Sequence, residues 1–122
     1  RGLDAAVSAL AARCPVPVEV RSELGGRRLS PAAEGAAYFV VAEALTNVAK
    51  HSAARKATVQ LEERDGRLFV DISDDGIGGA AAASTGGLRG MVDRVTAVEG
   101  RVRIASPAGG PTTLSVEVPC AS

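Results

Sequence analysis

Hydrophobic and polar positions follow two periods along this chain, and each period predicts one kind of element. Apolar residues at helical spacing predict a long helix over residues 31–51 and shorter helices over 2–13 and 88–98. Alternation of apolar and polar residues is clearest over residues 16–21 and 56–62 and predicts strands there. The full set of predicted strands is 16–21, 56–62, 68–73, 101–105 and 112–118.

Residues that favour caps and turns lie between these segments. Ser30 suits a helix N-cap and Pro31 suits the first helical position. Glu34 would complete a capping box, one residue later than the usual spacing. The segment Arg-Asp-Gly-Arg at 64–67 predicts a hairpin turn, and Gly100 is expected to cap the last helix.

The order of these elements is helix, strand, helix, two strands, helix, two strands. Strands joined as hairpins, with helices between the pairs, predict an α+β fold. We expect a two-layer sandwich in which about three helices cover one face of a mixed, mostly antiparallel sheet of about five strands. The 122 residues suit one domain, 1–122, with an aliphatic core, since there are two Phe, one Tyr and no Trp.

Composition excludes several classes of function. Lys plus Arg equals Asp plus Glu at 14 each, and there is no basic stripe, so nucleic-acid binding is not expected. No apolar stretch approaches the roughly 20 residues of a membrane span. Cys14 and Cys120 lack a CxxC pattern and are expected to be reduced and incidental. Because the chain opens on Arg1, we interpret it as part of a longer protein.

The long predicted helix carries candidate chemistry in its second half, EALTNVAKH. Glu43, Asn47, Lys50 and His51 are spaced i, i+4, i+7 and i+8, so they share one face. Carboxylate and amide oxygens suit Mg²⁺, and a lysine suits a phosphate. The alternative is an ordinary solvated helix face, with the histidine serving as a favourable charge at the helix end.

The segment DDGIGG at 74–79 has the form D-x-G-x-G. An aspartate at a strand end can accept a hydrogen bond from an exocyclic amine such as that of adenine. Glycines beyond it let a flat ring approach the backbone. A simple turn would explain Asp75 and Gly76, but not Gly78 and Gly79. The pattern therefore favours a ligand-binding loop.

A second glycine segment, TGGLRGM at 85–91, opens the last predicted helix. Free N–H groups and the helix dipole make such a start suitable for a phosphate, while a flexible helix entry is the alternative. The small residues 80–84 between the two glycine segments predict a mobile lid. P-loop, eukaryotic protein-kinase and serine-hydrolase motifs are absent from the sequence.

Four segments together resemble the ATP-binding catalytic domain of bacterial sensor histidine kinases, within the gyrase, Hsp90, histidine kinase and MutL (GHKL) superfamily and its Bergerat-type fold. The resemblance covers roughly residues 36–119. AEALTNVAKHS is similar to the N box, DDGIGG to the first glycine box, GGLRGMVDRV to the second and GGPTTLSVEVP to the closing threonine strand. EALTNVAKH and GLRGM are typical of kinases that pair with NarL-type response regulators.

The resemblance also implies roles for individual residues. Asp74 would bind the adenine amine, with Thr113 or Thr112 sharing a bridging water. Asn47 would hold Mg²⁺, and Glu43 would act through the water shell of the metal. The remaining implied nucleotide-binding residues are Lys50 and His51 near the phosphates, Gly76, Ile77 and Gly78 at the adenine pocket, and Gly86, Gly87 and Leu88 around the phosphates, the last two through N–H groups.

Two positions depart from the family pattern. Thr85 stands at the first position of the second glycine box, with Gly86 beside it, so the lid hinge would be stiffer or shifted by one residue. Pro111 stands before Thr112, where the family has a glycine, and it removes a donor from the turn predicted over residues 107–111. Neither departure removes a group expected to bind the metal or adenine.

The resemblance implies a cytoplasmic domain, either of a soluble kinase or of one anchored in a membrane by other parts. It would bind Mg-ATP and supply the γ-phosphoryl group to a histidine on a separate dimerisation domain, with a NarL-type response regulator downstream. The one histidine, His51, lies in the N box, so we expect this chain to be unable to phosphorylate itself. The resemblance places dimerisation on separate helices, so we also expect this chain to be monomeric. The alternatives are an anti-sigma-type serine kinase and a nucleotide-free interaction module.

Overall fold

The computed structural model describes residues 2–51, 54–76, 85–105 and 111–120, and the structural statements below concern these residues. The predicted order of elements is confirmed, with boundaries shifted by up to three residues. The elements are α1 (Leu3–Arg13), β1 (Val18–Ser22), α2 (Pro31–His51), β2 (Ala57–Arg64), β3 (Arg67–Asp74), α4 (Thr85–Ala97), β4 (Arg101–Ala105) and β5 (Thr112–Pro119).

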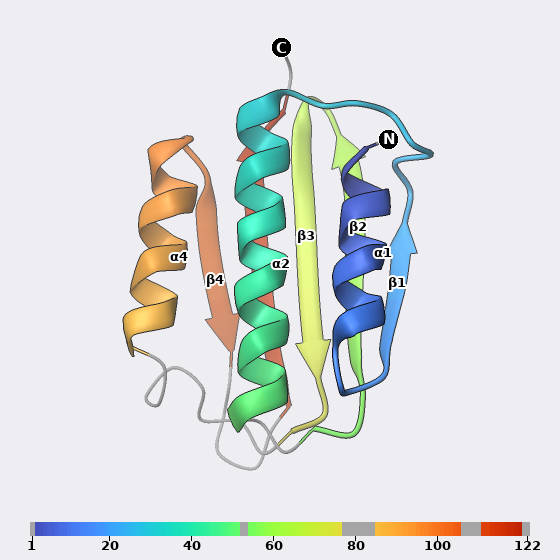
Figure 1. The fold of residues 1–122 in the computed structure, drawn as a ribbon. Coiled ribbons are helices and arrows are strands. Elements are labelled where there is room, and N and C mark those ends of the chain that lie inside the picture. Colours follow the sequence, from blue (N-terminus) through green and yellow to red (C-terminus); the bar gives the residue numbers. More distant parts are fainter. Residues whose placement is uncertain (1, 52–53, 77–84, 106–110, 121–122) are drawn as a thin grey trace.

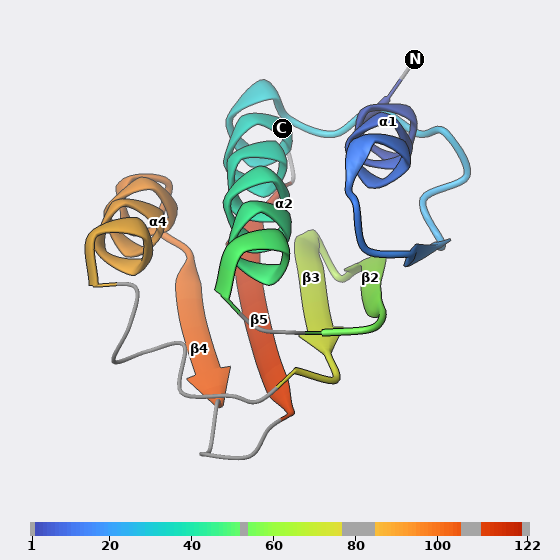
Figure 2. The same ribbon diagram turned by 60° about the horizontal axis from the view of Figure 1, so that its bottom comes forward.

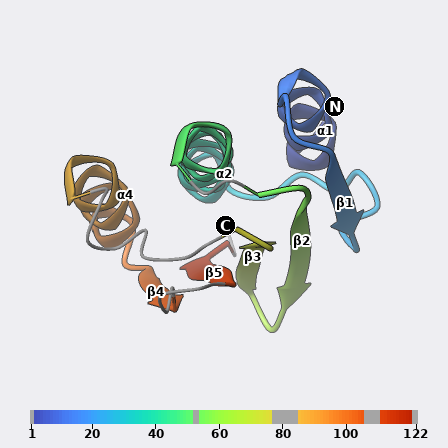
Figure 3. The same ribbon diagram turned by 90° about the horizontal axis from the view of Figure 1, so that it is seen from below.

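The strands form one five-stranded sheet in the order β1-β2-β3-β5-β4. β1 runs parallel to β2, and the other three neighbouring pairs are antiparallel. Figure 3 shows α1, α2 and α4 side by side on one face of this sheet. The expected two-layer α+β sandwich is therefore confirmed.

The core lies between the three helices and the covered face of the sheet, and it is aliphatic as expected. Val59, Leu61, Leu68 and Val70 are fully buried on the central strands, where they alternate with less buried residues. Buried side chains from the helix layer include those of Val7, Ala37, Val40, Val41, Met91 and Val95. Each such Leu, Val or Met contributes about 1.5–3 kcal/mol relative to an exposed position.

The start of α2 is fixed by the predicted cap residues. Ser30 Oγ accepts the Ala33 N–H at 3.3 Å, as an N-cap does. Glu34 reaches back past the N-cap, where its Oε2 accepts the Leu29 N–H at 2.9 Å and its Oε1 pairs with Arg28 at 2.9 Å. Because Glu34 stands one residue later than in a capping box, its carboxylate accepts the N–H of Leu29 and not that of the N-cap residue Ser30.

The prediction for the end of the last helix was wrong by one residue. The left-handed position that follows α4 is Glu99, with φ 64°, and not Gly100. The Glu99 N–H donates to Thr96 O and the Gly100 N–H to Val95 O, both at 2.9 Å, which is a Schellman arrangement. Gly100 is required for packing instead, because an added Cβ would lie 2.6 Å from the carbonyl oxygen of Glu117.

The hairpin between β2 and β3 turns at Asp65 and Gly66, as the sequence predicts. Both residues have positive φ, 53° and 77°, as required by the two-residue turn that matches the twist of paired strands. Gly66 also accepts the Cys120 N–H at 2.8 Å, which attaches the turn to the residue after β5.

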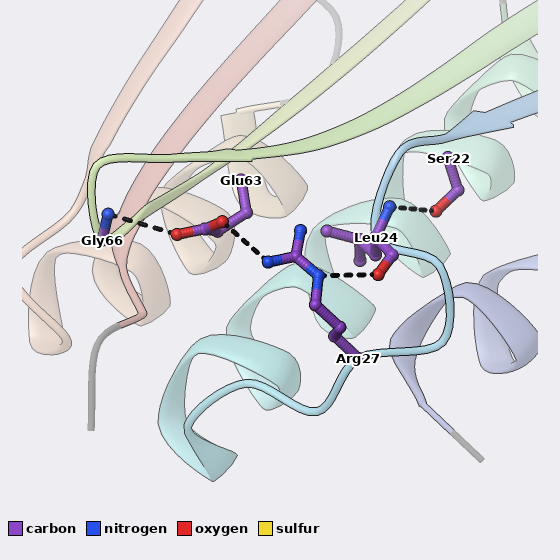
Figure 4. Close-up of polar contacts among 5 residues, drawn as sticks. All are labelled: Ser22, Leu24, Arg27, Glu63 and Gly66. Atoms are coloured by element: carbon purple, nitrogen blue, oxygen red, sulfur yellow. Dashed lines mark hydrogen bonds and ion pairs between the residues drawn. The ribbon is translucent and has the colours of Figure 1, made fainter.

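A polar cluster ties this turn to the connection between β1 and α2 (Figure 4). Glu63 accepts the Gly66 N–H at 3.2 Å and pairs with Arg27 Nη1 at 3.1 Å. Arg27 Nε donates to Leu24 O at 2.9 Å, and the Leu24 N–H donates to Ser22 Oγ at 3.2 Å. We call this region, with the β2–β3 turn, the hairpin end of the sheet.

Two expectations from composition can be compared with the described residues. Cys14 and Cys120 are both free thiols. No helix in the described ranges has the length and apolar character needed to cross a bilayer.

Candidate functional site

The opposite end of the sheet carries the two buried polar residues of the described chain. Asp74, at the end of β3, is 8% exposed, and Thr112, at the start of β5, is 9% exposed. The two residues are direct partners in the β3–β5 ladder. Figure 2 shows the ends of these strands near the C-terminal end of α2. We call this region the Asp74 end of the sheet.

The carboxylate of Asp74 lies in an unfavourable environment for a charge. Burial raises the pKa of Asp74, and the neighbouring charge of Asp75 raises it further. The Gly76 N–H donates to Asp74 Oδ1 at 2.8 Å and opposes that rise. A buried carboxyl group with a raised pKa at a strand end is a candidate for ligand binding.

Asp75 has the opposite environment, although it is the next residue. Its Oδ1 accepts the Arg55 N–H at 2.8 Å and the Lys56 N–H at 3.1 Å. These backbone donors, that of Lys56 most strongly, lower the pKa of Asp75. Sequence reasoning assigned Asp75 only to a turn, and no motif signals a bond to residues 19 and 20 positions away.

Glu43 and Asn47, the first two members of the predicted polar stripe on α2, lie on the side that faces α4. Phe39, one turn before Glu43 and two before Asn47, lies under the guanidinium group of Arg94 from α4, with its ring centroid 4.4 Å from Cζ. Glu43 and Asn47 are half-buried and have no hydrogen bond or ion pair with the other described residues. Their oxygens are therefore available to a ligand.

This donor set fits Mg²⁺ better than a transition metal. Amide and carboxylate oxygens are hard ligands, and Mg²⁺ usually keeps several waters while taking one or two protein oxygens and substrate phosphates. Within the described ranges, no three His, Cys, Asp or Glu residues come together as a metal cage.

The structure separates the two threonines expected near adenine. Thr112 is buried opposite Asp74, on the face covered by helices. Thr113 is opposite Ser73, so the alternation of the strand turns it to the other face. Thr112 is therefore the better partner for Asp74.

The second glycine segment lies inside a helix and not before it. α4 begins at Thr85, three residues earlier than predicted, so Gly86, Gly87 and Leu88 form its first turn. The first four N–H groups of an α-helix have no partner within the helix. These residues can thus offer N–H donors to an anion.

The other predicted site residues are only partly described. Lys50 and His51 belong to the last turn of α2, and the description of that turn is limited to its backbone. Gly76 is buried next to Asp74. Ile77 and Gly78, the predicted lid at residues 80–84 and most of the predicted turn before Pro111 lie outside the described residues.

A protein-family model matches most of this chain. The model described as "Histidine kinase-, DNA gyrase B-, and HSP90-like ATPase" matches residues 32–122. The sensor histidine kinase LiaS of Bacillus subtilis is 31% identical over 106 residues, which cover 84% of this chain and 29% of LiaS. MctS of Rhizobium johnstonii, also a sensor histidine kinase, is 34% identical over 128 residues, which cover 97% of this chain and 28% of MctS. The chain thus spans less than a third of these relatives.

Solved structures give the same fold at lower identity. The histidine kinase domain of a blue-light activated kinase from Erythrobacter litoralis EL346 has a TM-score of 0.73 and 22% identity, covering 96% of this chain and 58% of that one. Full-length ShkA in complex with AMPPNP has a TM-score of 0.74 and 20% identity, covering 98% of this chain and 29% of that one. At these identities the likeness concerns the fold.

Proposed function

Because this chain belongs to the histidine kinase-, DNA gyrase B- and HSP90-like ATPase family, as the ATP-binding domain of a sensor histidine kinase, we propose that it binds Mg-ATP for phosphoryl transfer to a histidine. The acceptor histidine would lie on a separate dimerisation domain. The family membership supplies the class of nucleotide, and the chemistry below assigns its parts to residues of this chain.

The observation that carries the proposal is the pairing of Asp74 with Thr112. They are the buried polar residues of the described chain, and they are neighbours at adjacent strand ends. A buried carboxylate costs free energy unless it has hydrogen-bond donors. Asp74 has the Gly76 N–H. The adenine amine would supply a further donor, and Thr112 would share a water with it.

The phosphates would extend from adenine toward α2 and the first turn of α4. Asn47 would hold Mg²⁺, and Glu43 would act through the waters of the metal, which supplies positive charge to the transferring phosphoryl group. Both side chains are half-buried and have no hydrogen bond or ion pair within the described part of the chain, which supports this role. The remaining phosphate contacts would come from Lys50 and His51 and from Gly86, Gly87 and Leu88, the last two through their N–H groups.

The acceptor and the partner protein lie beyond this chain in the proposal. The one histidine is His51, in the last turn of α2, where it would serve binding and not accept the phosphoryl group. We therefore propose that this chain alone does not phosphorylate itself. We also propose that it is monomeric, because the separate domain would carry dimerisation. In the cytoplasm it would serve a kinase whose downstream partner is a NarL-type response regulator.

Calorimetric titration tests the proposal. We expect the native chain to bind a non-hydrolysable ATP analogue more tightly with Mg²⁺ than without it. Asp74→Asn should reduce the affinity by about tenfold or more, because it replaces a charged acceptor with a neutral amide. Asp71→Asn is the matched control, since Asp71 lies on the same strand but is exposed. An analogue that binds native protein and Asp74→Asn equally would contradict the adenine assignment.

Absence of binding by the native chain would be a different result. It would contradict nucleotide binding by the isolated domain and favour an interaction module. Repeating the titration with the preceding helices of the full kinase restored would decide whether those helices complete the site.

A further inference from the structure

Asp75 connects the end of β3, which carries the adenine contact of the proposed site, to the segment that follows α2, which carries the metal contact. Its Oδ1 accepts the N–H groups of Arg55 and Lys56, and its own N–H donates to Lys56 O at 3.4 Å. Arg55 and Lys56 belong to the connection from α2 to β2. One exposed side chain therefore serves two backbone donors of that connection.

The connection is short, so an anchor at Arg55 restrains the end of α2. Four residue steps separate Arg55 from His51, the last residue of α2, and they span at most about 15 Å. Asn47 lies about 6 Å further back along the helix axis. The residue after this connection, Ala57 at the start of β2, is held as well, because its N–H donates to Pro17 O at 2.9 Å.

Asp75 directly follows Asp74, so the same bridge is fixed to the adenine side of the proposed site. We propose that Asp75 is a positioning residue that limits how far the end of α2, with Asn47, can lie from Asp74. The inference rests on the proposed function, because it concerns how the metal-phosphate and adenine contacts are kept in register. Asp75 itself would touch neither ligand.

The two neighbouring aspartates lie in different environments, which suit them to different roles. Asp74 is buried and its pKa is raised, whereas Asp75 is exposed and its backbone donors lower its pKa. An ionised carboxylate accepts stronger hydrogen bonds than a neutral group does. Asp75 therefore stays charged at neutral pH and suits a permanent anchor.

The first experiment compares Asp75→Ala and Asp75→Asn with Asp71→Ala. Each protein is titrated with a Mg²⁺-bound ATP analogue and with metal-free ADP. Misplacement of a bound group by about 1 Å can lower a reaction rate by up to about a hundredfold, and we take this as the upper limit for the loss of affinity. We expect Asp75→Ala to lose roughly ten- to a hundredfold for the Mg²⁺ complex and about threefold or less for metal-free ADP.

Asp75→Asn provides the graded comparison. Its amide oxygen can still accept both N–H groups but is a weaker, neutral acceptor. Its loss of affinity should therefore fall between those of the native chain and Asp75→Ala. Asp71→Ala should leave both affinities unchanged. Native binding with no selective loss in Asp75→Ala would overturn the inference, whereas failure of the native chain to bind either ligand would overturn the proposed function.

Amide hydrogen exchange in the ligand-free protein gives a readout that does not depend on nucleotide. In Asp75→Ala the amides of Arg55 and Lys56 should exchange about tenfold faster or more, because two hydrogen bonds are lost. Asp75→Asn should show a smaller increase, and it decides the question if Asp75→Ala does not fold. Unchanged exchange at both amides in a folded variant would show that Asp75 is no anchor.

Discussion

Glu63 and Asp74, two carboxylates at opposite ends of the sheet, lie in different environments. At the hairpin end, Glu63 meets both Arg27 and the Gly66 N–H, so the chain satisfies its own donors and acceptors (Figure 4). At the Asp74 end, a carboxyl group and a threonine are buried side by side. Asp74 keeps a raised pKa there. The chain thus builds one end for its own stability and leaves the other suited to a ligand.

This contrast separates stability from binding in space. Changes at the hairpin end should alter the free energy of unfolding and leave nucleotide affinity intact. Changes at Asp74 should weaken nucleotide binding without lowering the free energy of unfolding, because functional positions are often not optimised for stability. Three substitutions test this separation, beginning with the largest expected effect on stability.

Gly100→Ala should lower stability most. Its Cβ would lie 2.6 Å from Glu117 O, 2.6 Å from Val118 Cγ1 and 2.7 Å from Val95 Cγ1, so α4, β4 or β5 must shift. Overpacking of this kind costs about 1–3 kcal/mol. Denaturant unfolding should show the loss, and calorimetry should show native affinity for the ATP analogue in the folded protein.

Gly35→Ala is the matched control for that substitution. Gly35 lies within α2, is exposed, and an added Cβ would meet nothing within 4 Å. Alanine at such a helical site should stabilise the protein by about 1 kcal/mol. If Gly100→Ala proved as stable as Gly35→Ala, the close packing around Gly100 would not contribute as described.

Local signals account for most of what the sequence predicted about the fold. The Ser30 cap, the Asp65 and Gly66 turn and the alternating strands each depend on neighbours within a few positions, and each is confirmed. The role of Gly100 was predicted wrongly because the need for a glycine there comes from close packing against β5, which is distant in sequence. A glycine near a helix end fits both explanations, and the sequence alone does not distinguish them.

The site shows the same limit. Asp74 could be singled out from a motif, but the choice between Thr112 and Thr113 depends on strand register. The role of Asp75 depends on backbone donors 19 and 20 positions away, which no local pattern encodes. Residue types were thus predictable, whereas partners across the fold were not.

Asp74→Asn should leave stability unchanged or raise it by up to about 1 kcal/mol at neutral pH, while weakening nucleotide binding. Burial raises the folded-state pKa of Asp74 above the unfolded value of about 3.9. Such a group contributes stability below its unfolded pKa and loses that contribution as pH rises through its folded pKa. Asparagine does not ionise, so the variant should gain relative to native protein across that window.

Urea unfolding of both proteins from acidic to neutral pH measures this difference. The difference in stability between Asp74→Asn and native protein should increase with pH and then level off. A difference that decreased with rising pH would mean that the folded state favours the charged form of Asp74. The Asp74 end would then resemble the hairpin end, and the contrast between the two ends would be lost.

Glu63→Gln should have the smallest effect, about 0.5 kcal/mol of lost stability, because its ion pair with Arg27 is partly exposed. Glutamine retains one acceptor oxygen for the Gly66 N–H. High salt should remove most of the difference, since screening already weakens the native pair.

Glu62→Gln, which removes the comparable pair with Arg64, is the matched control that leaves the turn untouched. Calorimetry should give native affinity for both variants; a tenfold loss in Glu63→Gln alone would mean that the two ends are energetically coupled through β2 and β3.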